Sequence, residues 1–337
     1  MQKRYRHLLT IILVATHQNV WGIDLQPNDI VAPAPGWTAV TVSYINSQNN
    51  NFYLNGLATG GSPNLENNSA LFRLGHTYTI GLLPAITYVQ TGSSALSPDG
   101  SIAAYPMSKG MTDTTIATAI WPYANNITRT YFGVATYLSL PTGEYSNTKP
   151  LNVGSNRYST ALQMGYQRPL TTNIDGAIAF DTMWFGANSQ CAATCSSSSN
   201  VQLTQKPLYS TQLGPIYKIN QTYTVAATYV YVTGGETAFN GVERNNTVVT
   251  QRYFLSGVAH TTVGRFTLQY GNDIATMNGF MESRRLALRY TKAFWGVTGM
   301  LAERVGFEPT VGLHLRLISS QVHSTTLPPL RLTLNYT

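Results

Sequence analysis

The sequence alternates apolar and polar residues with a period of two, in segments of about ten to thirteen residues, throughout residues 36–295. In the segment 264–273, Phe266, Leu268 and Tyr270 fall on one face and polar residues fall on the other. Strands of water-soluble sandwiches are typically about five or six residues long, whereas a tilted strand of about ten residues crosses a bilayer core. The length of these segments therefore predicts strands that span a membrane.

Twelve segments of this kind occur, and twelve is an even number, as bacterial outer-membrane barrels require. They lie at 36–46, 70–82, 84–92, 111–122, 129–140, 157–168, 174–186, 207–219, 222–234, 250–261, 264–274 and 281–295. The predicted fold is all-β: a closed antiparallel transmembrane β-barrel of about twelve strands, formed by residues 36–295 in the outer membrane of a Gram-negative bacterium. Outer-membrane lipid is one expected partner. The barrel-assembly machinery is another, because the last segment ends in the aromatic residues Phe294 and Trp295.

The connections between these segments alternate between long and short. Long ones lie at 47–69, 93–110, 141–156, 187–206 and 235–249, with a shorter last one at 275–280. The others have about two to five residues. Outer-membrane barrels combine long outer loops with short periplasmic turns, and a sandwich has no reason to follow this rule. The connections therefore indicate a barrel independently of the strands.

Composition agrees with a wall that has one apolar face and one uncharged polar face. Charged residues make up only 10% of the chain, whereas soluble domains carry about 25%. The mean hydropathy of −0.09 excludes a bundle of apolar membrane helices. The formal net charge is +7, but no run of Lys or Arg with interleaved aromatic residues occurs. We therefore expect no nucleic-acid partner.

The chain begins with the features of a secretion signal. Lys3, Arg4 and Arg6 precede an apolar run, Leu8 to Ala15. That run is much shorter than the roughly 20 residues of a spanning helix, which disfavours a membrane anchor. We expect residues 1–22 to be a signal peptide and residues 23–35 to be a periplasmic N-terminal segment.

The chain continues for 42 residues beyond the last predicted strand. Within this tail, Leu301 to Thr310 resembles the translation of a neighbouring transfer-RNA gene. We therefore expect residues 296–337 to be disordered or to be a read-through artefact. The alternative is that 312–319 and 330–336 form two extra strands.

Cys191 and Cys195 are the only cysteines. In an exported protein a local disulfide is the favoured state of such a pair. A free pair and a metal site are the alternatives, but zinc would need further ligands at suitable spacing, and His76 and His260 are distant in sequence. No metal and no cofactor are expected.

Several short motifs resemble one known family, the outer-membrane transporters associated with the meta-cleavage pathway of phenol degradation. These motifs are Met111-Thr-Asp113, Leu140-Pro-Thr-Gly-Glu-Tyr145, Leu151-Asn-Val-Gly-Ser-Asn-Arg157, Lys206-Pro-Leu-Tyr209, Gly234-Gly-Glu-Thr237 and Asn240-Gly241. The resemblance spans roughly residues 23–295 and implies a small barrel that passes hydrophobic aromatic compounds. The cysteine loop and the long tail depart from the family pattern.

The family motifs also have a local explanation. Pro141 ends strand pairing and Gly143 permits a positive φ, so that the chain can fold out of the barrel wall. The remaining residues of this motif, Thr142, Glu144 and Tyr145, and the pair Gly234 and Gly235, leave the same choice between a structural role and ligand gating. No nucleophile–base constellation is recognisable, so we do not expect an enzyme.

If the strand phases hold, a set of charged residues faces the interior. This set of lumen-lining candidates contains Arg73, Asp113, Asp175, Asp181, Lys218, Arg265, Asp273, Arg285 and Arg289. Such charges either form structural ion pairs that plug a narrow barrel or line a conducting path.

The arginines of the last two strands, Arg265, Arg285 and Arg289, predict a positive stripe and a mild anion preference. The alternative is that Asp175 and Asp181 neutralise this stripe from across the lumen. Two functions are compatible with these features. The first is a channel for uptake of small solutes, including hydrophobic aromatic compounds. The second is a structural or surface-interaction barrel that acts through its extracellular loops.

Overall fold

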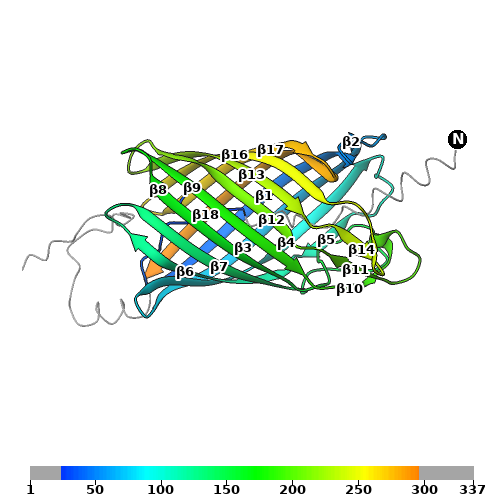
Figure 1. Cartoon of the computed structure of the whole chain (residues 1–337), viewed down its shortest axis with the longest axis horizontal. Coiled ribbons are helices and arrows are strands. Elements are labelled where there is room, and N and C mark those ends of the chain that lie inside the picture. The colour runs from blue at the N-terminus through cyan, green and yellow to red at the C-terminus, as the bar shows by residue number, and fades with distance from the viewer. Residues whose placement is uncertain (1–23, 296–337) are drawn as a thin grey trace, which may run out of the picture.

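The computed structural model describes residues 24–295, in which twelve long antiparallel strands form one closed barrel (Figure 1). These strands are β1 (Trp37–Leu54), β3 (Pro63–Ile80), β4 (Leu83–Gly100), β6 (Thr114–Asn125), β7 (Thr130–Leu140), β8 (Ser159–Pro169), β9 (Ile174–Phe185), β12 (Leu208–Lys218), β13 (Tyr223–Gly234), β16 (Val248–Thr261), β17 (Gly264–Thr276) and β18 (Gly279–Trp295). Each strand pairs with the next in chain order, and β18 pairs with β1. The predicted fold is confirmed. The expected signal peptide and the tail at 296–337 lie outside the described residues.

The seam between β1 and β18 closes the barrel. Its ladder runs from Trp37 opposite Trp295 to Tyr53 opposite Gly279. The two tryptophan rings meet edge to face, with centroids 4.6 Å apart, a geometry that aromatic pairs prefer. Within the described residues, no helix is long and apolar enough to cross a bilayer.

Side chains alternate between the lipid face and the lumen along each strand. On β1, Val42 and Tyr44 are about half exposed, at 50% and 48%, while Thr41 and Ser43, which alternate with them, are buried. Because successive side chains of a strand point to opposite faces, the apolar set meets lipid and the small polar set lines the interior. The period-two pattern of the sequence produces this arrangement directly.

The first three strands extend further outward than predicted. Residues 47–69 and 93–110 were expected to be loops, but β1, β3 and β4 continue into them as regular ladder. The side chain of Asn46, for example, donates to Glu66 across the β1–β3 ladder at 2.9 Å. These extensions are mostly polar, apart from a few residues such as Phe52 and Leu65 that are buried at the mouth. This composition suits strands that project beyond the bilayer, and it hides them from a search for alternation.

The long connections gather at one end of the barrel and the short turns at the other (Figure 1). Short strands extend the outer ends of the sheet, β2 (Leu57–Ala58) beside β1 and β5 (Ser108–Met111) beside β4. A separate four-stranded sheet lies at the same outer end. It consists of β10 (Asn188–Cys191), β11 (Val201–Gln205), β14 (Thr237–Phe239) and β15 (Val242–Glu243).

Cys191 and Cys195 form a disulfide in the connection between β9 and β12, with Cα atoms 5.5 Å apart. A short 3-10 helix, η2 (Ala193–Cys195), turns the chain back to bring the two residues together. The bond lies in a small apolar core with Leu203, and both cysteines are buried. The predicted disulfide is confirmed.

The protein purified from outer membranes should therefore carry no thiol that reacts with maleimide until it is reduced. The double substitution of Cys191→Ser with Cys195→Ser should remove roughly 2 kcal/mol from the local stability of this connection. The expected result is faster protease cleavage within residues 186–207, while the barrel stays intact. Two reactive thiols in the unreduced protein would contradict the assignment.

Candidate functional site

The N-terminal segment, residues 24–35, runs through the interior of the barrel. Its backbone and side chains bond to inward-facing groups of strands that are not neighbours in the wall. The Leu25 N–H donates to Gln212 of β12, and the Gln26 amide donates to Gln269 of β17, at 3.1 and 3.0 Å. Because a single segment reaches strands that lie apart in the ring, it must occupy the lumen.

This placement corrects the expectation that residues 23–35 form a periplasmic segment. The sequence of the segment has no period of its own and contains three prolines among few polar residues. What fixes it in the lumen is charge and apolar contact with strands that are distant in sequence, and a pattern search along one segment cannot detect such partners. Only its last residues reach the periplasmic rim, where the Gly36 N–H donates to the Thr77 carbonyl at 2.7 Å.

The N-terminal segment carries the counter-charges of the predicted positive stripe. Asp24 pairs with Arg285. Asp29 lies 3.7 Å from Arg265 and 3.5 Å from Arg289, measured between carboxylate oxygen and guanidinium nitrogen. These ion pairs join the stripe to acids of the segment itself, whereas Asp175, an expected counter-charge, pairs with Arg129 and Lys218.

An apolar contact anchors the inner part of the segment. Ile30 packs in a buried cluster with Trp121, Tyr131 and Ala179. The Trp121 indole N–H also donates to the Ile30 carbonyl at 2.7 Å. Full burial of such a side chain contributes roughly 1.5–3 kcal/mol. Ile30 therefore holds the segment more firmly than its partly exposed ion pairs do.

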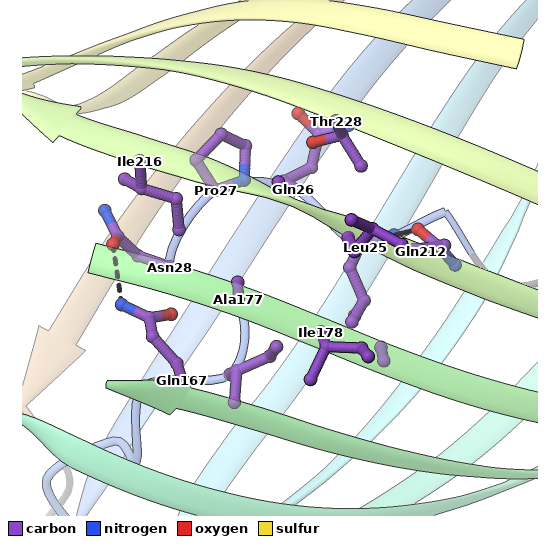
Figure 2. Close-up of a pocket in the computed structure, with 14 residues that line it drawn as sticks. Leu25, Gln26, Pro27, Asn28, Gln167, Ala177, Ile178, Gln212, Ile216 and Thr228 are labelled. Carbon is purple, nitrogen blue, oxygen red and sulfur yellow. Dashed lines mark hydrogen bonds between the residues drawn. The ribbon is translucent and has the colours of Figure 1, made fainter. Parts of the chain in front are cut away.

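The other side of the segment is loosely packed. Figure 2 shows Leu25, Gln26, Pro27 and Asn28 beside the walls formed by β8, β9 and β12. A cavity of about 30 Å³ separates the segment from wall residues that include Ala177 and Gly214, and its size suits about one water molecule. Beside this cavity, the Gln167 amide lies 3.5 Å from the Asn28 side-chain oxygen (Figure 2).

A buried charge network lies further out in the lumen. Arg252 bonds to Asp273 at 2.6 Å and lies 3.1 Å from Glu282, and Arg285 lies 3.4 Å from Glu282. Arg252 and Glu282 were not among the sequence candidates. Arg252 alternates with outward-facing Tyr253, so the phase of β16 could have revealed it. Such a network is costly to break, because a lone buried charge is left behind.

Near the periplasmic end, Asp175 is bound by two cations. Lys218 lies 2.6 Å away and Arg129 lies 3.2 Å away, and Asp175 itself is buried. Asp181 is also buried, further out on the same strand. Arg129 was not among the sequence candidates. It was expected to begin the strand at 129–140, but it lies in the preceding turn with a positive φ.

Asp113 lies at the outer mouth and organises the mouth loop, residues 141–158 between β7 and β8. It accepts hydrogen bonds from the Gly143 N–H, the Ser155 N–H and the Ser155 hydroxyl at 2.9, 2.9 and 2.5 Å. The bend places Gly143 against Gly154, where a side chain on Gly143 would come within 2.7 Å of the Gly154 Cα. The family motif therefore has a clear structural role. Asp113 is the centre of this loop and does not lie on the barrel wall.

The mouth loop reaches across the opening. Leu151 and Val153 are fully buried against Phe52, Leu65 and other apolar residues of β1, β3, β4 and β18. In the barrel these strands lie away from β7 and β8, which carry the loop. A loop that starts at one wall and packs on another covers the mouth.

The remaining motif residues join the mouth loop to the outer sheet. The Tyr145 hydroxyl donates to the Gln190 carbonyl at 3.1 Å and accepts from Asn188 at 3.0 Å. Thr142 bonds to Thr114, and the Glu144 N–H donates to the Met111 carbonyl. Burial lowers the pKa of the Arg157 guanidinium to about 10.

The glycine pair turns the chain away from the end of β13. Gly234 and Gly235 have φ of +101° and +65°, values that favour glycine. The neighbouring Glu236 pairs with Lys206 at 2.8 Å, and this hydrogen bond lowers the pKa of Glu236. Within residues 24–295 no cluster of three or more metal-ligating side chains occurs.

Comparison with known proteins identifies relatives of this barrel. The family model described as "Putative MetA-pathway of phenol degradation" matches residues 55–290. The crystal structure of an outer membrane channel from Pseudomonas putida F1 has a TM-score of 0.76 and 26% sequence identity, and the match covers 80% of this chain and 100% of that one. No functionally curated protein matches the sequence significantly.

More distant structures share only general barrel features. The β domain of a Bordetella autotransporter has a TM-score of 0.47 at 9% identity, covering 77% of this chain and 100% of that one. The translocator domain of an autotransporter from Neisseria meningitidis has a TM-score of 0.44 at 10% identity, covering 87% and 95%. These two likenesses are too weak to indicate a function.

The family match covers well over half of the sequence and includes the mouth loop with its Pro-Thr-Gly-Glu-Tyr motif. The chain is thus an outer-membrane β-barrel that belongs to the family described as "Putative MetA-pathway of phenol degradation".

Proposed function

We propose that the protein is an outer-membrane channel for small solutes, closed in the described conformation by its N-terminal segment and its mouth loop. The observation that carries this proposal is the N-terminal segment inside a lumen lined by Gln, Ser, Thr and charged groups. The likeness to an outer membrane channel supports it. The family description supports small aromatic compounds as solutes.

Transport, and not catalysis, is the proposed role. Of the two histidines within residues 24–295, His76 is exposed on the outer face beside Thr38, whereas His260 faces the interior opposite Arg265. The two imidazoles therefore lie on different sides of the wall. Lipid around the barrel and a solute in its lumen are the partners that this role requires, and the barrel-assembly machinery remains a proposed partner for insertion.

Opening requires the segment to leave its ion pairs while the wall stays intact. The side chains of Asp29, Arg265 and Arg289 are each between a fifth and about a quarter exposed. Ion pairs that water reaches contribute about 0–1 kcal/mol each. The wall is held by continuous ladders and apolar contacts, so the segment is the weaker of the two structures.

Deletion of residues 24–30 should increase the conductance of the purified protein in planar bilayers. The same deletion removes Asp24 and Asp29, which leaves the lumenal arginines without their counter-charges. A positive stripe in a low-dielectric channel raises the local anion concentration. The reversal potential in a salt gradient should therefore shift towards anion selectivity.

The substitution of Asp24→Asn with Asp29→Asn provides a control that keeps the length of the chain. It should shift selectivity in the same direction, with a smaller rise in conductance. Equal conductance in the full-length and shortened proteins would reject the segment as the obstruction. An absence of conductance in both would favour the other function, a barrel that acts through its extracellular loops.

Asp113→Ala should loosen the mouth loop, because hydrogen bonds to a charged acceptor contribute roughly 1.5–3 kcal/mol each. We expect faster protease cleavage within 141–158 in intact cells and more frequent openings in bilayer recordings. Asp99→Ala is the matched control, since Asp99 is exposed at the same end of the barrel. Equal cleavage of the two variants would show that Asp113 does not hold the loop.

A further inference from the structure

Three guanidinium groups lie at one level of the lumen, and two of them pair with the same carboxylate, that of Asp29. We call Arg73 of β3, Arg265 of β17 and Arg289 of β18 the arginine cluster. Thr41 of β1 pairs with Arg73 on one side and with Thr291 on the other, and Thr291 in turn pairs with Arg265. The three arginines therefore lie at about the same depth, on the part of the wall formed by β17, β18, β1 and β3. Asp29 pairs with two of them, Arg265 and Arg289.

The positive charge of this cluster exceeds what Asp29 supplies. Among residues 24–295, none of the ion pairs involves Arg73, which instead bonds to Gln90 and lies over the Tyr88 ring. Asp29 itself stands at 3.5 and 3.7 Å from its two arginines, longer than the usual 2.7–2.9 Å or so of a charge-assisted hydrogen bond. The cluster thus has capacity for a better-placed anion.

Polar atoms beside the cluster are buried without a partner in the described part of the chain. They are the Arg265 Nε, the Thr267 Oγ1 and the His260 Nε2. All three belong to inward-facing residues of β16 and β17, and His260 lies directly opposite Arg265. Buried polar groups are rarely left unpaired, and each exception calls for a water, an ion or a ligand.

An aromatic surface adjoins the cations. The Arg73 guanidinium stacks on the Tyr88 ring, 4.1 Å from its centroid. The Tyr137 ring meets Tyr88 edge to face, with centroids 6.5 Å apart, and its hydroxyl donates to Gln163 at 3.0 Å. A planar ring placed beside Tyr88 would keep its own charged substituent within reach of the arginines.

We propose that the arginine cluster is a binding site for the carboxylate of a small aromatic acid, and that Asp29 occupies this site as an internal competitor. An incoming carboxylate replaces Asp29 between Arg265 and Arg289, and its ring packs beside Tyr88. Binding thereby releases the N-terminal segment. This proposal rests on the proposed channel function, to which it adds a solute class and a means of opening.

Asp29 is suited to such an exchange. Its Oδ2 accepts the Gln26 N–H at 3.0 Å, so the released carboxylate keeps a partner within its own turn. The cavity on the opposite side of the segment leaves space for a shift. Ile30, bound to Trp121, stays as the fixed point about which residues 24–29 move.

The test is calorimetric titration of the full-length protein in nonionic detergent at low salt, with benzoate, benzyl alcohol and acetate as probes. Low salt limits the screening of the partly exposed charges. Benzoate should bind more tightly than either of the other probes. Asp29→Asn should raise the benzoate affinity by a factor on the order of ten, because it removes the charge of the competitor and keeps the shape of the turn. Arg265→Gln with Arg289→Gln should lower that affinity by a similar factor.

Arg284→Gln is the matched control, since Arg284 is next to Arg285 on β18 but exposed on the opposite face, and it should leave benzoate binding unchanged.

Unchanged benzoate affinity in Asp29→Asn would overturn the proposal, and this variant decides even if the double arginine variant fails to fold. Equal affinity for acetate and benzoate would overturn the aromatic part. Titration measures binding whether or not the barrel conducts. Benzoate binding without conductance would therefore reject the channel alone, and conductance without binding would reject this site alone.

Discussion

The pairing of β18 with β1 is the interaction on which the rest of the structure depends. In a bilayer each unsatisfied backbone group costs several kcal/mol, so a sheet with free edges cannot cross it. The seam removes both edges with a continuous ladder, and the edge-to-face ring pairs of Trp37 with Trp295 and of Phe52 with Phe280 reinforce its two ends. The closed wall then creates an interior that must be filled with water or with the chain itself.

The chain fills much of this interior with its own N-terminal segment, and charge determines where the segment lies. The wall presents Arg265, Arg285 and Arg289 on adjacent strands, and the segment supplies Asp24 and Asp29. Opposite this charged side the segment meets small residues and a cavity. Because the segment is held by ion pairs on one side and borders a cavity on the other, a solute can take its place. The hydrogen-bonded ladders of the wall cannot be replaced in this way.

The sequence was sufficient to predict the strands of the wall, because the alternation of apolar and polar residues is a pattern within each strand. Lipid outside and polar groups inside impose alternation within each strand, and eleven of the twelve predicted strands begin within three residues of the observed positions. β3 is the exception and begins earlier, because its outer part is mostly polar and lies beyond the bilayer, where lipid no longer imposes alternation. The same phase was used to predict which side chains face the lumen, and Asp113 departs from it because it lies at the mouth.

The partners of those side chains could not be predicted, because pairing in a lumen depends on residues that are distant in sequence. Arg265 and Asp29 are separated by more than two hundred positions. One signal was nevertheless present: the segment before the first strand contains two acids, while the last two strands contribute inward-facing arginines. Pro141 and Gly143 predicted the bend of the mouth loop, although Gly143 is required by its close approach to Gly154 and not by a positive φ. The position of the loop across the opening could not be predicted, because it depends on where Leu151 and Val153 pack.

The central claim is that movement of the N-terminal segment opens the lumen. A reducible cross-link made with a bis-methanethiosulfonate reagent between Asn28→Cys and Gln167→Cys, whose native side chains are 3.5 Å apart at their polar ends, tests it in a background with Cys191→Ser and Cys195→Ser. Conductance should be blocked in the cross-linked protein and should return after reduction, because the cross-link fixes the segment to β8. Equal conductance before and after reduction, with the cross-link verified by mass spectrometry, would contradict the account.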